Sequence, residues 1–237
     1  NNAYKINPQM FDVWMRILQR VPGSVLWLQG GGQEKVKENL SKEASERGVD
    51  PTRLVFAHKI ESMAEHLARH RAADVFLDTL PFNAQTTAVD ALWAGLPVLT
   101  CLGESSFGRI AGSVLMALGM PELVAASLEE YEAQAVRIGL EGGYAKSLKD
   151  KLEGNRKEAP LFDTARLTRH MERAYERMHE RARQGLGAQA FAVQAQEAGS
   201  RMQEQRGAEP AVEVIQTQAQ TQAQTQAQTQ AQFNEAI

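Results

Sequence analysis

Short apolar runs alternate with amphipathic helical patterns along roughly the first 180 residues of the chain. Continuous apolar strands separated by helices are typical of a parallel sheet covered on both faces. We therefore predict a Rossmann-like α/β fold, in which ligands bind beyond the carboxyl ends of the strands. The expected strands are residues 24–29, 54–57, 74–78 and 97–101. Helices are expected at residues 8–21, 62–71, 86–94, 127–157 (with interruptions) and 164–183, with two more ending at residues 47 and 118.

Side chains at the predicted helix starts support these boundaries. Asn7 precedes Pro8, a pair that suits an N-cap followed by the first helical position. Ser and Glu stand three residues apart at 62 and 65 and again at 127 and 130, which is the spacing of a capping box. The three tryptophans, Trp14, Trp27 and Trp93, fall at positions that we expect in the core.

Beyond Gly187 the composition changes, and Gln, Ala and Glu dominate. Residues 216–232 repeat Gln-Thr-Gln-Ala with a four-residue period. Such a segment has too few aliphatic and aromatic residues to offset the entropy lost on ordering. We therefore divide the chain into a folded domain, residues 1–183, and a largely disordered tail, residues 184–237, with a frayed helix around residues 191–205. An adhesive Gln-rich interaction segment is the functional alternative for this tail.

Charge and cysteine content exclude several classes of protein. The net charge is −3, and the three acidic residues of the last thirty positions account for it, so the remainder is neutral. A neutral body argues against a broad nucleic-acid or anionic-membrane surface. Cys101 is the sole cysteine, which excludes an intrachain disulfide or a zinc cluster and fits a reducing, cytoplasmic location. No apolar run approaches the roughly 20 residues of a membrane span.

The stretch after the third predicted strand, residues 78–95, carries the most chemical information. Thr86 and Thr87 open a helix, where the first N–H groups lack partners and the helix dipole favours an anion such as a pyrophosphate. Asp90 lies on the same face one turn further, where its carboxylate can accept hydrogen bonds from ribose hydroxyls. By spacing alone, an ordinary capped helix with a first-turn acid is the better interpretation.

The sequence from Leu77-Asp78-Thr79 to Leu99-Thr100 resembles the bacterial O-linked N-acetylglucosamine transferase family, also called the SPINDLY family. The resemblance continues in unbroken order over residues 1 to about 182, and it corresponds to the carboxyl-terminal half of the family's catalytic region. Further matching segments are Tyr4-Lys5-Ile6, Glu65-His66-Leu67-Ala68-Arg69-His70, Leu118-Gly119-Met120-Pro121 and Pro160-Leu161-Phe162-Asp163. The chain also starts without a methionine, so it reads as a piece of a longer protein.

This resemblance implies the second lobe of a GT-B glycosyltransferase that is metal-independent, inverting and free of cofactors, with UDP-GlcNAc as donor substrate. A protein Ser or Thr hydroxyl would be the acceptor. The missing amino-terminal lobe and its tetratricopeptide repeats would be partners. Residue by residue, the resemblance assigns the donor phosphates to the catalytic Lys5, the pyrophosphate to Thr86 and Thr87, the ribose to Asp90 and the nucleoside to His66. Asn2 occupies a neighbouring donor position.

The chain departs from the family pattern at two places. Gln85 stands where the family usually has histidine; its amide can donate to a phosphate but cannot become a cation. Residues 56–65 form a loop one residue longer than usual, in which Lys59 is the best candidate to reach the base or ribose. The other histidines, including His70, are expected to be solvated.

The leading hypothesis is thus a UDP-GlcNAc-dependent protein glycosyltransferase without a bound metal. The body shows neither paired carboxylates at metal-ligand spacing nor a histidine cluster, so Lys5 and the helix start would stabilise the leaving diphosphate. Two alternatives stay open: a GDP-fucose-dependent protein O-fucosyltransferase, and a non-catalytic fragment that acts as a binding or scaffolding module. A dehydrogenase is disfavoured because the G-x-G-x-x-G spacing is absent.

Overall fold

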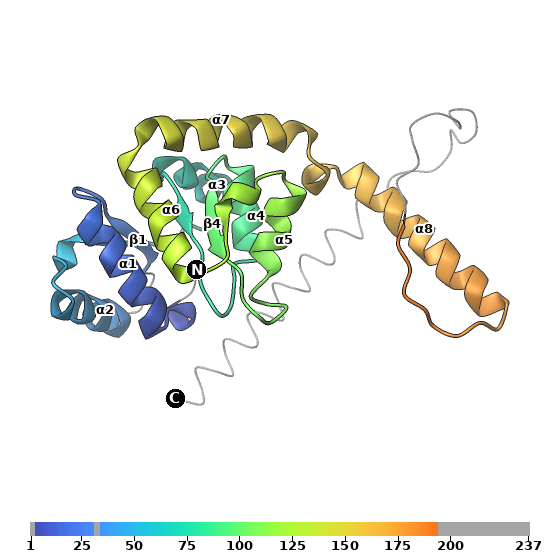
Figure 1. The fold of residues 1–237 in the computed structure, drawn as a ribbon, viewed down its shortest axis with the longest axis horizontal. Coiled ribbons are helices and arrows are strands. Elements are labelled where there is room, and N and C mark those ends of the chain that lie inside the picture. Colours follow the sequence, from blue (N-terminus) through green and yellow to red (C-terminus); the bar gives the residue numbers. More distant parts are fainter. Residues whose placement is uncertain (1–2, 31–33, 194–237) are drawn as a thin grey trace. The chain divides into compact units, whose positions relative to one another are not determined.

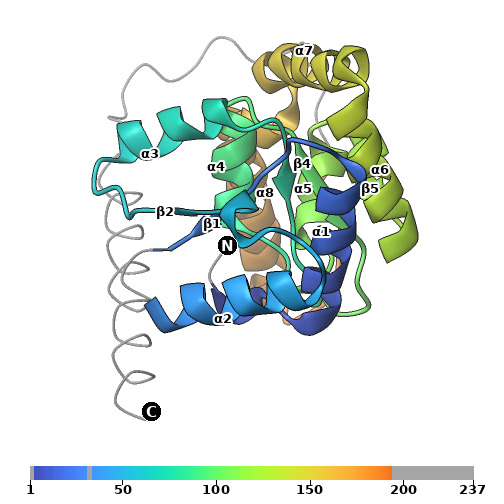
Figure 2. The same ribbon diagram turned by 90° about the vertical axis from the view of Figure 1, so that its left-hand side faces the viewer.

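The computed structural model describes residues 3–30 and 34–193 (Figures 1 and 2). The helices are α1 (Pro8–Arg20), α2 (Glu34–Glu46), α3 (Met63–Arg69), α4 (Thr86–Trp93), α5 (Ile110–Ala117), α6 (Leu128–Leu140), α7 (Gly142–Glu158) and α8 (Thr164–Arg183). The strands are β1 (Leu26–Gln29), β2 (Leu54–Ala57), β3 (Phe76–Leu77), β4 (Val98–Cys101) and β5 (Val124–Ala125). Single 3-10 turns include η1 (Ala3–Lys5), η3 (His70–Ala72) and η5 (Pro160–Phe162).

All described strand pairs are parallel, and helices flank them, so the predicted α/β class is confirmed. The strands form two hydrogen-bonded groups within the described residues, β1 with β2 and β3 with β4 and β5. A cavity of about 560 Å³ is lined by residues of both β1 and β3, which belong to different groups. Sequence analysis missed β5, whose two residues are too short for a periodic signal.

Helix α1 begins as predicted, with the Asn7 side chain accepting a hydrogen bond of 2.8 Å from the Met10 N–H and with Pro8 at the first position. Its apolar face is buried and packs against α6. Ser62 and Ser127 also accept from the N–H three residues later, so both predicted capping serines are confirmed. The helical region predicted at residues 127–157 divides at Glu141 into α6 and α7.

The predicted last helix is confirmed as α8, which ends at Arg183. Residues 188–193 are not helical, so the frayed helix predicted around residues 191–205 is wrong for its first three positions, and the rest lies outside the described residues. Two tryptophan predictions also fail. Trp14 is buried, but Trp27 and Trp93 are 41% and 51% exposed. No helix in the described ranges is long and apolar enough to cross a membrane.

A buried hydrogen-bond chain links α1, α6 and the end of β3. The Tyr131 hydroxyl donates to the Asp78 main-chain oxygen at 2.9 Å and accepts from the Trp14 indole N–H at 3.3 Å. Tyr131 is fully buried, and burial raises the pKa of its phenol well above the ordinary value. The hydroxyl therefore stays protonated and fixes the main chain where the candidate site begins.

Tyr131→Phe tests this chain of bonds. It leaves the buried indole N–H without its acceptor and the Asp78 carbonyl without this donor, so we expect the free energy of unfolding to fall by about 1–3 kcal/mol. Tyr175→Phe is the control, because Tyr175 is exposed and the change should stay within about 0.5 kcal/mol. Urea unfolding followed by circular dichroism measures both, and equal small effects would contradict the proposed linkage.

Candidate functional site

The loop that joins β3 to α4, residues 78–85, is held by its own polar side chains. Asp78 is 1% exposed; one carboxylate oxygen accepts from the Ala84 N–H at 2.6 Å and the other from the Thr100 hydroxyl at 2.7 Å. The Thr79 hydroxyl donates to the Phe82 carbonyl, and the Asn83 amide donates back to the Thr79 carbonyl. These bonds give the loop one conformation and set where α4 begins.

The segment before α1 is attached to this loop at two points. The Lys5 ammonium donates to the Asn83 carbonyl at 3.0 Å and lies 4.5 Å from the centre of the Phe82 ring. The Asn7 amide donates to the Leu80 carbonyl at 2.6 Å. Burial lowers the pKa of Lys5, and the Asp78 carboxylate partly offsets that change. The structure therefore brings the predicted lysine to the loop directly before Thr86.

The amino-terminal end of α4 is open to a ligand. Gln85 occupies the N-cap position, and its side chain makes no capping hydrogen bond. Thr86 and Thr87 are exposed. Uncapped N–H groups, two hydroxyls and the positive end of the helix dipole suit an anion at this position.

Asp90 of α4 interacts electrostatically with His66 of α3 and His70 of η3. Burial raises the pKa of Asp90, an effect that the charges of His66 and His70 oppose. The pKa of His66 is lowered, first by burial and then by Arg69 and His70, whereas Asp90 opposes the change. The carboxylate and the two imidazoles therefore influence one another's protonation.

The partners of the two imidazoles determine which nitrogen carries the proton. The Arg69 guanidinium, which can only donate, lies 3.0 Å from His66 Nδ1, so the neutral His66 ring carries its proton on Nε2. His70 Nδ1 lies 2.8 Å from the His66 carbonyl, which can only accept, so His70 carries its proton on Nδ1. The rings meet edge to face, with centroids 5.0 Å apart.

The prediction that His70 is solvated is wrong, because its side chain is half-buried and hydrogen-bonded. Its spacing of four residues from His66 was the available signal, because such residues share one helical face. His66, His70 and Thr87 line the same cavity of about 560 Å³. Lys59 stands apart: its side chain is 72% exposed and pairs with Glu61 at 3.2 Å. Asn2 lies outside the described residues.

Metal-ligating side chains are not clustered in the part of the chain that the structure describes. No three His, Cys, Asp or Glu side chains there are arranged to hold a metal ion. Cys101 is buried, and burial raises the pKa of its thiol.

We predict that Asp90→Asn stabilises the folded chain at pH 7. A raised pKa means that the folded state disfavours the carboxylate, so the associated stability is present in acid and is lost as the pH rises through the folded-state pKa. The amide removes this penalty at neutral pH. Its advantage should shrink as the pH falls below about 4, where the carboxyl becomes protonated in the unfolded state as well.

Urea unfolding at pH 7 and at pH 3.5 measures the effect. Asp150→Asn is the matched control, since Asp150 forms a surface ion pair with Lys146 and its loss should bring no gain. An Asp90→Asn chain less stable than the parent at pH 7 would show that its partners stabilise the carboxylate more than burial penalises it.

The chain is similar in sequence to a family of glycosyltransferases. The model of glycosyl transferase family 41 matches residues 1–171. A UDP-N-acetylglucosamine–peptide N-acetylglucosaminyltransferase of Caenorhabditis elegans is 39% identical over 186 residues, which are 78% of this chain and 16% of the relative. A rice protein named as a probable enzyme of the same kind, SPINDLY, is 29% identical over 183 residues, covering 76% of this chain and 20% of the relative.

Among solved structures, an O-GlcNAc transferase mutant of Thermobaculum terrenum superposes with a TM-score of 0.73 at 33% identity. The match covers 78% of this chain and 36% of that one. The chain thus spans a fifth or less of the curated relatives named here and about a third of the solved structure.

Proposed function

The chain belongs to glycosyl transferase family 41, and we propose that it is the donor-binding carboxyl-terminal lobe of a bacterial protein O-GlcNAc transferase. In the full-length protein it would hold UDP-GlcNAc while N-acetylglucosamine passes to a protein Ser or Thr hydroxyl. The Lys5 ammonium on the Asn83 carbonyl, beside the uncapped start of α4, is the observation that carries this proposal. The bacterial assignment rests on the motifs of residues 77–100.

The proposed reaction is a direct displacement with inversion. The acceptor oxygen forms a bond to the anomeric carbon as the bond from that carbon to the diphosphate breaks, and the hydroxyl proton leaves to a base. UDP departs with additional negative charge. Lys5 and the α4 N–H groups would stabilise that charge without a divalent ion, because they are fixed before the reaction begins. The base has no assigned residue in this chain.

We assign the rest of the donor to Asp90, His66 and their neighbours. Asp90 would accept hydrogen bonds from the ribose hydroxyls, and the Nε2–H of His66 offers one donor toward the nucleoside. Gln85 can donate its amide to a phosphate oxygen. Lys59 and Asn2 complete the proposed set, with Lys59 moving from Glu61 to the ligand.

The low fraction of each relative that this chain covers supports a proposal about partner domains. We infer that an amino-terminal lobe and tetratricopeptide repeats complete the enzyme, and that it acts in the cytoplasm, where the free thiol of Cys101 would remain reduced. Helix α8 offers a surface for such a lobe, since one face exposes a row of apolar side chains: Leu167, Met171, Tyr175 and Met178.

Lys5→Ala tests the diphosphate role. In the full-length protein we expect transfer to slow by a factor equivalent to about 2–4 kcal/mol, as for a lost oxyanion donor, measured with radiolabelled UDP-GlcNAc and an acceptor peptide. Lys35→Ala is the control, because Lys35 lies on α2 in a surface ion pair with Glu38. Normal turnover by the Lys5 variant would refute its assignment.

Nucleotide preference tests the donor class. By calorimetry we expect the isolated chain to bind UDP weakly, to prefer it to GDP, and to transfer no sugar on its own. Asp90→Asn should weaken UDP binding, although it stabilises the fold. A preference for GDP would favour the fucosyltransferase alternative. If the chain bound neither UDP nor GDP, the result would favour a scaffolding module.

A further inference from the structure

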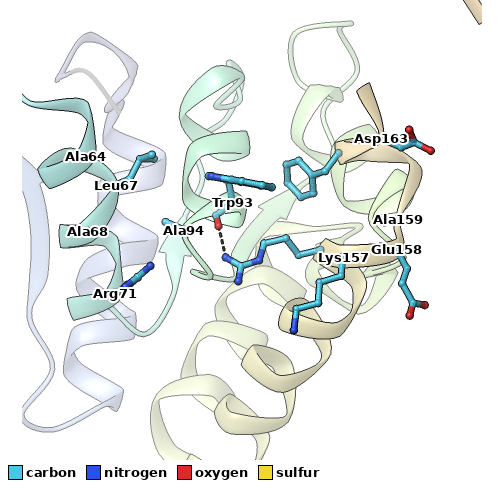
Figure 3. A pocket seen from close by; sticks show the side chains of 12 residues that line it. Ala64, Leu67, Ala68, Arg71, Trp93, Ala94, Lys157, Glu158, Ala159 and Asp163 are labelled. Atoms are coloured by element: carbon cyan, nitrogen blue, oxygen red, sulfur yellow. Dashed lines mark hydrogen bonds between the residues drawn. The ribbon is translucent and has the colours of Figure 1, made fainter. Parts of the chain in front are cut away.

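A second cavity lies away from the proposed donor site, between α3, the end of α4 and the end of α7 (Figure 3). It is an open groove of about 880 Å³. One wall consists of Ala64, Leu67 and Ala68 of α3, with Arg71 of η3. The opposite side is formed by Trp93, Phe162 and residues 156–159. This volume is within the range of ligand-binding clefts in proteins.

The groove exposes aromatic surface that no other described residue covers. The Trp93 indole is 51% exposed and lies 5.2 Å, between ring centroids, from Phe162. Arg156 fixes this wall, since its guanidinium donates to the Trp93 carbonyl and lies 5.9 Å from the indole centroid (Figure 3). Leu67 points into the groove from the other side. A rigid, half-exposed tryptophan beside a cavity is typical of a binding surface.

Cations face the groove from both walls, whereas its carboxylates point elsewhere. Arg71 makes no ion pair within the described residues, and Lys157 has only an exposed pair with Glu153 at 3.2 Å, which is worth little. Figure 3 shows Glu158 and Asp163 directed away from the cavity. The Asp163 carboxylate also caps α8, accepting from the Arg166 N–H at 2.8 Å. An apolar strip between two cationic edges complements an acidic segment with an apolar anchor.

We propose that this groove docks a short acidic peptide segment of a partner protein. An aliphatic or aromatic side chain of that segment packs between Leu67 and Trp93, while its carboxylates pair with Arg71 and Lys157. The site is separate from the donor cavity, because α3 presents different faces to the two: His66 and Arg69 line the donor cavity, and Leu67 lines the groove. Both sites can therefore be occupied together, and the proposal does not rest on the donor assignment.

Fluorescence anisotropy tests the proposal. The full chain is titrated into a labelled peptide in which glutamates flank a central Leu-Phe pair. We expect saturable binding that weakens as salt is raised, since the pairing is electrostatic at the rim. A peptide with lysine in place of glutamate should not bind, and one with serine in place of Leu-Phe should bind about tenfold more weakly. Saturating UDP should leave the affinity unchanged.

Charge reversals locate the binding surface. Arg71→Glu and Lys157→Glu should each lower the affinity for the peptide by about tenfold. Lys146→Glu is the matched control: it lies on α7, pairs with an acidic residue four positions away as Lys157 does, and is outside the groove, so its effect should stay within about twofold. Equal effects at positions 146 and 157, or no binding of the acidic peptide, would overturn the proposal. A dimer seen by sedimentation and abolished by Arg71→Glu would overturn it too, because it would assign the groove to a second copy of the chain.

Discussion

Asp78 joins β3 to β4 and to the loop before α4 through the two oxygens of one buried carboxylate. Its main-chain oxygen accepts a hydrogen bond from the Tyr131 hydroxyl. The same residue is therefore linked to α6 and, through Tyr131, to α1. A buried carboxylate is costly unless its oxygens are satisfied, and here a backbone N–H and a hydroxyl do so. The position of the α4 helix start relative to the sheet follows from this arrangement, and Lys5 then binds a loop that is already fixed.

The proposed donor site contains charges that the unliganded fold does not favour. Burial lowers the pKa of Lys5 and raises that of Asp90, so in each case the charged form is penalised. The Gln85 side chain likewise gives the α4 N–H groups no capping hydrogen bond. A diphosphate beside Lys5 and hydroxyls beside Asp90 would supply the missing partners. The bound ligand would then stabilise the charged forms that the free protein penalises, and this would contribute to the binding free energy. Active sites often sacrifice folding stability in this way.

Sequence patterns predicted the class of fold and most helix boundaries, because caps such as Asn7, Ser62 and Ser127 act through bonds to residues three positions away. They failed where distant contacts decide. The exposure of Trp93 depends on how α7 and η5 approach α4, and His70 is ordered by a carbonyl and a cavity that no local pattern contains. The expectation that Lys5 acts together with the start of α4 came from the family resemblance, since composition and periodicity carry no signal for it. Its contact with Asn83, 78 residues away, appears only in the structure.

Helix α3 separates the two cavities. It is short, with seven residues, and none of them is fully buried. Helices of this length are not stable alone, so its position depends on contacts made through its side chains. His70 bonds back to the His66 carbonyl, and Arg69 donates to His66 and to the His58 carbonyl, which holds the donor-side face together. The groove-side face, by contrast, presents two alanines and Leu67 to open space. The polar contacts that order α3 therefore lie on its donor side, and substitutions on the groove side can change recognition there without removing them.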